Sequence, residues 1–273
     1  MGATIARMYP PFFDPERDMP DLSGKVILVT GGNVGIGYET VKYLLMKNAK
    51  VYLAARSPDK AVAAIKRLEE ETKKSAIFLE LDLADLKSVR KAAEEFLEKE
   101  GKLDVLFNNA GVMNAPSKML TVQDYDLQFG TNVLGHFFFT ELLLPALKKS
   151  YEETQIPARV INVSSVGHRY APGKGINFAS LKKSAERDKY VKWSSWRLYG
   201  QSKIGNIYTS NYWAKTHSDV LVSCSLNPGG IKTDLYRHSG KWFEVLIDWT
   251  AFPTYLGAYT QLCTVGSKFN QAD

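Results

Sequence analysis

A tyrosine and a lysine stand four residues apart in Tyr199-Gly-Gln-Ser-Lys203. At that spacing on a helix, the phenol and the ammonium share one face. A ketone that accepts a hydride needs a proton donor at the oxygen that becomes an alkoxide. A free tyrosine titrates near pH ~10, and a neighbouring ammonium lowers its pKa. The pair could therefore work as a tuned acid/base, although two such common residues can also be surface neighbours.

Polar residues upstream stand in the order that such a site needs. Ser165 ends the strand-like run Asn162–Ser165, where its hydroxyl could hold a substrate oxygen as an oxyanion hole does. Asn108–Gly111 follows another strand, and Asn132 opens a long apolar segment. Taken singly, Ser165 could be a turn residue, easily confused with Ser164, and Asn132 a helix cap. Their joint order favours catalysis over packing.

A glycine-rich turn, Thr30-Gly-Gly-Asn-Val-Gly-Ile-Gly37, follows the apolar run Lys25–Thr30 and opens a helical pattern. Glycine lets the backbone turn tightly and approach a pyrophosphate closely. The helix N-terminus then offers free N–H groups and a partial positive charge. A purely structural turn is the alternative, but the strand–turn–helix context indicates dinucleotide binding.

The end of the second strand discriminates between NAD and NADP. An acidic side chain there would bond the ribose 2′-hydroxyl and repel a 2′-phosphate, but this chain has Ala55 followed by Arg56. The missing acid and the adjacent guanidinium favour NADP(H), unless Arg56 simply faces solvent. Asp82, after the third strand, could accept from the adenine amino group or cap a short turn.

Strand and helix patterns alternate along the chain, which predicts an α/β fold: a single-domain, Rossmann-like, doubly wound parallel sheet with helices on both faces. Residues 1–22 contain four prolines and are expected to form an extended arm before a domain spanning 23–273. Strands are predicted at 25–30, 51–55, 76–80, 103–107, 158–165 and 220–226. Helices are predicted at 36–48, 58–73, 86–100, 132–149, 196–214 and 253–264.

The composition sets limits on function. The chain has 273 residues and a net charge of +6, with no block of five like charges, which argues against a nucleic-acid-binding tail. Cys224 and Cys263 lie in no Cys-x-x-Cys or Cys/His cluster, so no metal is expected. No secretory signal or membrane-spanning run is recognised. A cytoplasmic protein is predicted, with peripheral membrane contact as an alternative.

Together these motifs resemble the short-chain dehydrogenase/reductase family over about residues 22–265. The runs 132–137 and 199–206 are most similar to the retinol-dehydrogenase-like and WW-domain-oxidoreductase-like branch. The resemblance implies the catalytic residues Asn132, Ser165, Tyr199 and Lys203. It also implies the NADP-binding residues Gly31, Asn33, Gly35, Ile36, Gly37, Arg56, Asp82, Leu83, Asn109, Ala110, Gly111, Tyr199, Lys203, Pro228, Gly229, Ile231 and Thr233.

The resemblance further assigns roles. Lys203 would bind the nicotinamide ribose hydroxyls, and Asn132 would support a water linking Lys203 to solvent. The segment that contains Pro228 and Thr233 would close over the nicotinamide amide and the diphosphate. The helices 132–149 and 196–214 would pair across a two-fold axis in a homodimer, unless they pack only within a monomer.

The expected substrate loops, 166–195 and 230–252, are rich in aromatic residues, which suggests an apolar carbonyl/alcohol substrate. Within the second loop, 241–249 could instead lie on a membrane surface. Two other functions therefore stay open: a catalytically weak NADP-binding scaffold, and a peripheral membrane reductase of lipid-like substrates. Relatives usually add a seventh strand, and none is recognised in 265–273, so six strands are predicted, with the sixth as an exposed edge.

Overall fold

The computed structural model describes residues 12–173, 175–190, 195–232 and 251–266. Its strands are β1 (Val26–Thr30), β2 (Lys50–Ala55), β3 (Ile77–Glu80), β4 (Val105–Asn108), β5 (Ala158–Val163) and β6 (Leu221–Leu226). They form one parallel sheet in the order β3-β2-β1-β4-β5-β6. The strand order reverses between β1 and β4, and ligands of such sheets bind at the carboxyl ends of the strands beside that point.

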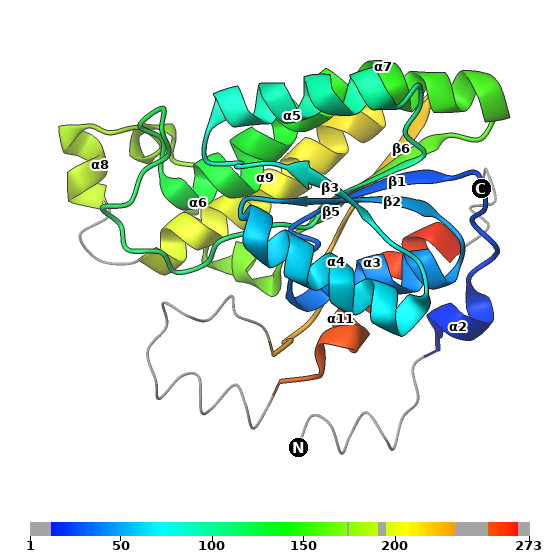
Figure 1. The fold of residues 1–273 in the computed structure, drawn as a ribbon. Coiled ribbons are helices and arrows are strands. Elements are labelled where there is room, and N and C mark those ends of the chain that lie inside the picture. Colours follow the sequence, from blue (N-terminus) through cyan, green and yellow to red (C-terminus); the bar gives the residue numbers. More distant parts are fainter. Residues whose placement is uncertain (1–11, 174, 191–194, 233–250, 267–273) are drawn as a thin grey trace.

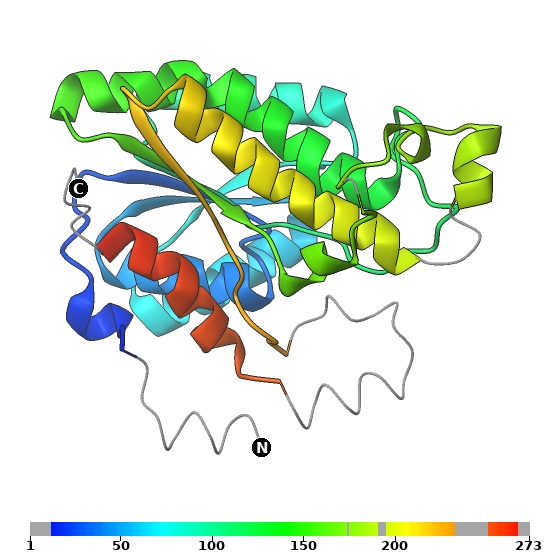
Figure 2. The ribbon, with the colours of Figure 1, turned by 180° about the vertical axis from the view of Figure 1, so that it is seen from behind.

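Helices cover both faces of the sheet (Figures 1 and 2). One face carries α3 (Gly35–Met46), α4 (Pro58–Thr72) and α11 (Thr254–Gly266), and the other carries α5 (Leu86–Lys99), α7 (His136–Thr154) and α9 (Ser195–Thr216). Each layer buries its own apolar cluster against the strands. All five residues of β1 are buried, as a central parallel strand between two helix layers requires. The predicted α/β architecture is therefore confirmed.

Short elements fill the carboxyl edge of the sheet. They are α6 (Leu127–Phe129), the π-helix η1 (Gly130–Gly135), the 3-10 helices η2 (Val166–Tyr170) and η3 (Phe178–Ser180), and α8 (Ala185–Tyr190). Most predicted helices and strands differ from the observed ones by only one or two residues at an end. The larger differences lie at the N-terminal arm and at Asn132.

The described part of the N-terminal arm is not extended as predicted. Pro15–Asp18 form the short helix α2, where the Asp14 side chain accepts from the Glu16 N–H. Met19 and Leu22 are buried in the cluster beneath α3 and α11. Proline is well tolerated in a first helical turn, which explains why Pro15 starts a helix here.

Asn132 lies inside the π-helix η1, so its alternative interpretation as a helix cap is wrong. The predicted helix 132–149 continues as α7 to Thr154. In a π turn the backbone bonds run from i to i+5, which changes the partners of the local carbonyls and is frequent at functional sites.

Several sequence predictions fall outside the described residues. They concern residues 1–11 of the arm, Thr233 with the run 241–249 in the second loop, and 267–273, on which the absence of a seventh strand depends. Among the described strands β6 is an edge. No helix in the described ranges is long and apolar enough to cross a bilayer.

Candidate active site

A cavity of about 370 Å³ opens at the carboxyl edge of the sheet. Its walls are the glycine turn after β1, the ends of β2 and β3, the segment 109–113 after β4, the end of β5, and α9. Most of the predicted cofactor residues line it, and so do Ser165, Tyr199 and Lys203. Asn132 does not reach the wall, but its side chain contacts the segment that does.

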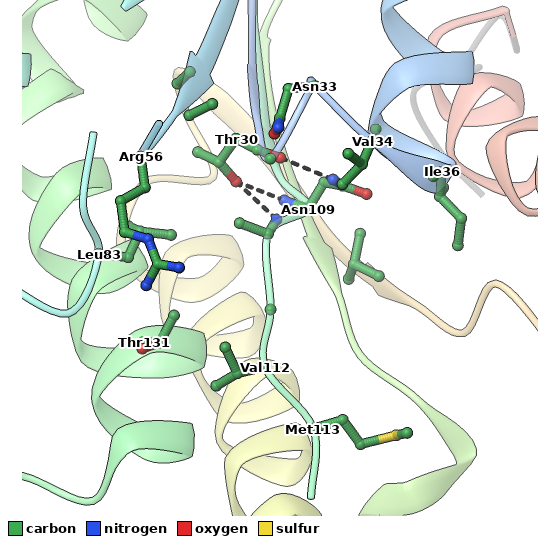
Figure 3. A pocket seen from close by; sticks show the side chains of 18 of the residues that line it. Thr30, Asn33, Val34, Ile36, Arg56, Leu83, Asn109, Val112, Met113 and Thr131 are labelled. Atoms are coloured by element: carbon green, nitrogen blue, oxygen red, sulfur yellow. Dashed lines mark hydrogen bonds between the residues drawn. The ribbon is translucent and has the colours of Figure 1, made fainter. Parts of the chain in front are cut away.

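The glycine turn is shaped for close backbone approach (Figure 3). Gly31 has φ +66°, and its N–H donates to the Ala54 carbonyl at 2.7 Å. A Cβ on Gly37 would lie 2.3 Å from the Gly31 carbonyl oxygen, so only glycine fits there. The first turn of α3 follows directly, and no side chain of its N-cap residue Val34 bonds the helix N–H groups. The residues of this first turn line the cavity, and the N–H groups of a helix N-terminus suit an anion.

Two cations line the other end of the cavity. Arg56 extends beside Leu83 toward Thr131 (Figure 3), and Lys60 lies in the first turn of α4. Ser57, the N-cap residue of α4, lines the same wall. Sequence reasoning missed Ser57 and Lys60. The sequence Ser57-Pro58 marks a helix start, so the signal for a first-turn lysine near Arg56 was present.

Asp82 occupies a turn as well as the cavity wall. Its Oδ1 accepts from the Ala84 N–H at 2.9 Å, and its own N–H donates to the Ser88 hydroxyl. The alternative that Asp82 stabilises a short turn is therefore confirmed. Because Asp82 also lines the cavity, the turn fixes a carboxylate in the cavity wall.

The segment after β4 is held by the hydroxyl of Thr30, which the sequence did not single out. Thr30 Oγ1 accepts from the N–H groups of Asn109 and Ala110, at 3.0 Å each (Figure 3). The Asn109 amide in turn donates to the Thr30 carbonyl at 2.8 Å. Asn108 points elsewhere: its Nδ2 donates to Thr140 Oγ1 and to Asn162 Oδ1 on β5, at 3.0 Å each.

Tyr199 and Lys203 lie on one face of α9, and each is 3% exposed. The Lys203 Nζ lies 5.7 Å from the centre of the Tyr199 ring and donates to the Val163 carbonyl at 2.9 Å. Burial lowers the pKa of Lys203 from 10.5 to about 8. The lysine is thus still largely protonated near neutrality, beside the phenol.

The two serines after β5 have separate positions. The buried Ser164 hydroxyl donates to the Lys203 carbonyl at 2.8 Å, which holds α9 against β5. Ser165 is half-buried, and its hydroxyl accepts from the Gly167 N–H at 3.1 Å. A Cβ on Gly167 would lie 2.7 Å from the Tyr199 ring and 3.4 Å from Ser165 Oγ. Ser165 and Tyr199 therefore meet around the same glycine.

Asn132 is fully buried and clamps the segment after β4 to α9. Its Oδ1 accepts from the Val112 N–H at 2.8 Å, and its Nδ2 donates to the Val112 carbonyl and the Ser202 hydroxyl at 2.9 Å. A Cβ on Gly111 would lie 3.6 Å from Lys203 Nζ. Asn132 thereby fixes the backbone that passes over the lysine.

Pro228, Gly229 and Ile231 line the cavity after β6. Ile231 pairs with Phe252 in a parallel bridge and is 4% exposed. Met113 and Val112, which the sequence did not predict, add apolar surface beside them.

Fold and site together define a class of dinucleotide-dependent oxidoreductase, and the comparisons with known proteins name it. Residues 25–187 match the short chain dehydrogenase family. A short-chain dehydrogenase/reductase of Armillaria gallica is 53% identical over 262 residues, covering 94% of this chain and 82% of the relative. An uncharacterized oxidoreductase of Schizosaccharomyces pombe is 43% identical, covering 90% and 73%. The chain belongs to the short-chain dehydrogenase/reductase family.

Solved structures agree with the fold. An uncharacterized protein from Mycobacterium paratuberculosis is similar with a TM-score of 0.71 and 30% identity, covering 94% of this chain and 81% of the other. The Pseudomonas aeruginosa RhlG/NADP active-site complex gives a TM-score of 0.69 at 24% identity, covering 91% of each chain. The narrower retinol-dehydrogenase-like branch stays a prediction.

Proposed function

We propose that this protein is an NADP(H)-dependent reductase or dehydrogenase of an apolar carbonyl/alcohol pair, with Tyr199 as general acid/base. One observation carries the proposal. A single cavity is bordered by the glycine turn and Arg56 and also by Ser165, Tyr199 and Lys203, from distant parts of the chain. A dinucleotide that spans this cavity would have its phosphates at one end and its reactive ring beside the tyrosine.

The residues present fit a dinucleotide. The absence of a Cβ on Gly37 lets α3 start directly against the Gly31 backbone, and the N-terminus of α3, which has no side-chain cap, suits a pyrophosphate. The oxidoreductase chemistry then requires that the cofactor, when bound, supplies or takes up the hydride.

The cations favour NADP over NAD. Arg56 and Lys60 line the end of the cavity where β2 meets α4, and Ala55 stands where an acidic side chain would bind a ribose diol. A 2′-phosphate would meet a planar guanidinium and an ammonium, both suited to phosphate. Similar solved structures of this fold were determined with NADP or NADPH, which is consistent with this preference.

Tyr199 would donate the proton to the substrate oxygen in reduction and remove it in oxidation. Lys203, close to the ring and protonated near pH 7, favours the phenolate and lowers the cost of that transfer. Ser165 would hold the substrate oxygen through its hydroxyl. Asn132 would keep the segment above Lys203 in position, so that the ammonium stays directed at the site.

Aromatic and apolar side chains support an apolar substrate. The Trp196 ring lies 6.2 Å from the Tyr199 ring and 6.1 Å from the Tyr170 ring, centre to centre. Trp196 and Tyr170 lie outside the cavity wall, and Val112, Met113 and Ile231 give the wall its apolar surface. Such a wall binds hydrocarbon better than charged metabolites. The aromatic run 241–249 lies outside the described residues.

The test is NADPH oxidation by the purified protein with a panel of aliphatic and aromatic aldehydes and ketones, with Tyr199→Phe as the matched control. We expect turnover with at least one apolar carbonyl, and loss of turnover with retained NADPH binding in the variant. Tight NADPH binding without turnover on any substrate would support the scaffold alternative instead.

A homodimer through α7 and α9 is also proposed. The two helices lie side by side, with the Phe137 and Tyr212 rings 5.7 Å apart, and Tyr208 and Tyr212 are 48% and 46% exposed. Light scattering of the wild-type protein and of Tyr212→Glu would test it. A monomeric wild-type protein would contradict it.

A further inference from the structure

His136 is a buried imidazole to which the proposed chemistry gives no role. It is 2% exposed at the start of α7, directly after the π-helix that contains Asn132. Its Nδ1 lies 3.1 Å from the Asn132 carbonyl oxygen, and its Nε2 lies 2.9 Å from Thr30 Oγ1. The ring therefore touches an end of β1 and a carbonyl of η1 at the same time.

Hydrogen-bond counting assigns one form of this ring. The Asn132 carbonyl can only accept, so Nδ1 must carry a hydrogen and donate. Thr30 Oγ1 already accepts from two backbone N–H groups, and its single hydrogen can go to the Phe107 carbonyl at 3.2 Å or to His136 Nε2 at 2.9 Å. Burial lowers the pKa of His136 and so favours the neutral ring. With its hydrogen on Nδ1, Nε2 is bare and accepts from the Thr30 hydroxyl, at a shorter distance than the Phe107 carbonyl does. The site holds a neutral imidazole with its hydrogen on Nδ1.

The two partners of His136 anchor the same strip of backbone, Asn109–Val112. Thr30 holds the N–H groups of Asn109 and Ala110 at one end. The Asn132 amide holds the N–H and the carbonyl of Val112 at the other end. His136 is the side chain that connects these two anchors to each other.

The strip between the anchors borders the reaction site. It lines the cavity, and a Cβ on Gly111 would lie 3.4 Å from Asn132 Oδ1 and 3.6 Å from Lys203 Nζ. A shift of Asn132 would move Val112 on one side and Ser202, next to Lys203, on the other. The orientation of Lys203 and the position of the strip 109–112 in the cavity wall thus both depend on Asn132.

We propose that His136 is a positioning residue that holds the strip 109–112 and Lys203 in register for hydride transfer, by joining Thr30 to the Asn132 carbonyl. The inference rests on the proposed function, since it assigns a part in that same reaction. His136 does not contact the reacting atoms, and it lies outside the cavity wall.

Three variants separate the hydrogen bond of His136 to the Asn132 carbonyl from its hydrogen bond to Thr30. His136→Asn keeps an amide donor near the position of Nδ1, His136→Gln keeps an amide near the position of Nε2, and His136→Leu removes both. Misplacement of a reacting group by about 1 Å can cost about 100-fold in rate. We therefore expect His136→Leu to lower kcat by about 10–100-fold, with an increased deuterium isotope effect from labelled NADPH and little change in the KM for the carbonyl substrate.

The conservative variant provides the rescue. We expect His136→Asn to keep kcat within about threefold of wild type, because the Asn132 carbonyl keeps its donor, and His136→Gln to lie between Asn and Leu. Wild-type kcat and isotope effect in His136→Leu would overturn the proposal. So would equal losses of kcat in all three variants that follow their losses in thermal stability, since this would show a role in folding only.

A readout without turnover keeps this inference separate from the proposed function. Amide hydrogen exchange of the NADPH-bound protein should be faster within 109–112 in His136→Leu than in wild type, and near wild type in His136→Asn. Unchanged exchange in His136→Leu would overturn the proposed positioning role of His136, even if the enzyme is active. If wild type turns over no carbonyl, the proposed function fails, and the exchange data alone then decide whether His136 joins the two anchors.

Discussion

The glycine turn after β1 and the Tyr199–Lys203 pair on α9 border the same cavity, but they are built in opposite ways. The turn is made by leaving side chains out: Gly37 must be bare because a Cβ would meet the Gly31 carbonyl at 2.3 Å. The pair on α9 instead consists of polar side chains that are buried: Lys203 and Tyr199 are each 3% exposed. The first region is defined by shape and the second by charge.

This difference sets what each region should tolerate. A steric cradle is damaged by one added methyl group and is indifferent to pH. A buried ammonium beside a buried network is sensitive to protonation and to the loss of a single hydrogen bond. His136 and Thr30 connect the two regions. Thr30 directly precedes the glycine turn, and its hydroxyl bonds both His136 and the N–H of Asn109.

The largest effect is expected when the proposed proton donor, the Tyr199 hydroxyl, is removed. Tyr199→Phe should lower kcat for carbonyl reduction by about 1,000-fold, within the range for losing a general acid, because the ring packing against Gly167 is kept while the hydroxyl is lost. Steady-state kinetics and NADPH titration by fluorescence would measure it. A loss of less than tenfold would mean that another group supplies the proton.

Buried titratable groups should also make the free energy of unfolding depend on pH, and His136 is one of them. Burial lowers the pKa of His136 from 6.5 to about 4, so the unfolded chain takes up this proton near pH 6.5 and the folded chain only near pH 4. The contribution is fully present above about pH 6.5 and is lost as the pH falls to 4, at a cost of about 3 kcal/mol. The charge of Lys203 also lowers the pKa of His136, whereas the hydrogen bond to the Asn132 carbonyl opposes the shift.

Urea unfolding at several pH values, compared between wild type and His136→Asn, would isolate this effect from that of the carboxylates. The difference in the free energy of unfolding between the two proteins should change with pH between 6.5 and 4. A pH-independent difference would show that the folded protein accommodates the charged imidazole.

The steric region is tested by one methyl group. Gly37→Ala should weaken NADPH binding by about 10–100-fold, since overpacking costs about 1–3 kcal/mol and the clash is with backbone. Gly101→Ala is the matched control, because a Cβ there meets nothing within 4 Å. Calorimetric titration of both variants would be decisive, and equal affinities would contradict a cradle defined by shape.

The smallest expected effect is on cofactor choice. Arg56→Ala should reduce the preference for NADPH over NADH by about tenfold, the size of one lost charge-assisted bond, and Lys60→Ala should reduce it by less. The ratio of kcat/KM for the two cofactors measures the preference, and Lys66→Ala on the same helix is a control outside the cavity wall. An unchanged ratio in Arg56→Ala would place phosphate recognition elsewhere.

The sequence determined the fold and predicted most of the residues that line the cavity. Apolar runs ending in glycine or asparagine predict parallel strands, and the run Thr30–Gly37 between a strand and a helix predicts the turn. These are local patterns, since each depends on residues within about ten positions of one another. Family resemblance linked them into one proposed catalytic set.

Tertiary structure decided what joins those residues. Thr30 and His136 lie 106 positions apart, and nothing in their own neighbourhoods marks a hydrogen bond between them. Ser164 and Ser165 are equivalent on the printed chain and both line the cavity, and only the packing of α9 commits the Ser164 hydroxyl to the helix backbone. The π turn at Asn132 was also missed, because a helical pattern does not reveal a local change in hydrogen-bond spacing. Burial and long-range hydrogen bonds are properties of the assembled fold, so they become visible only there.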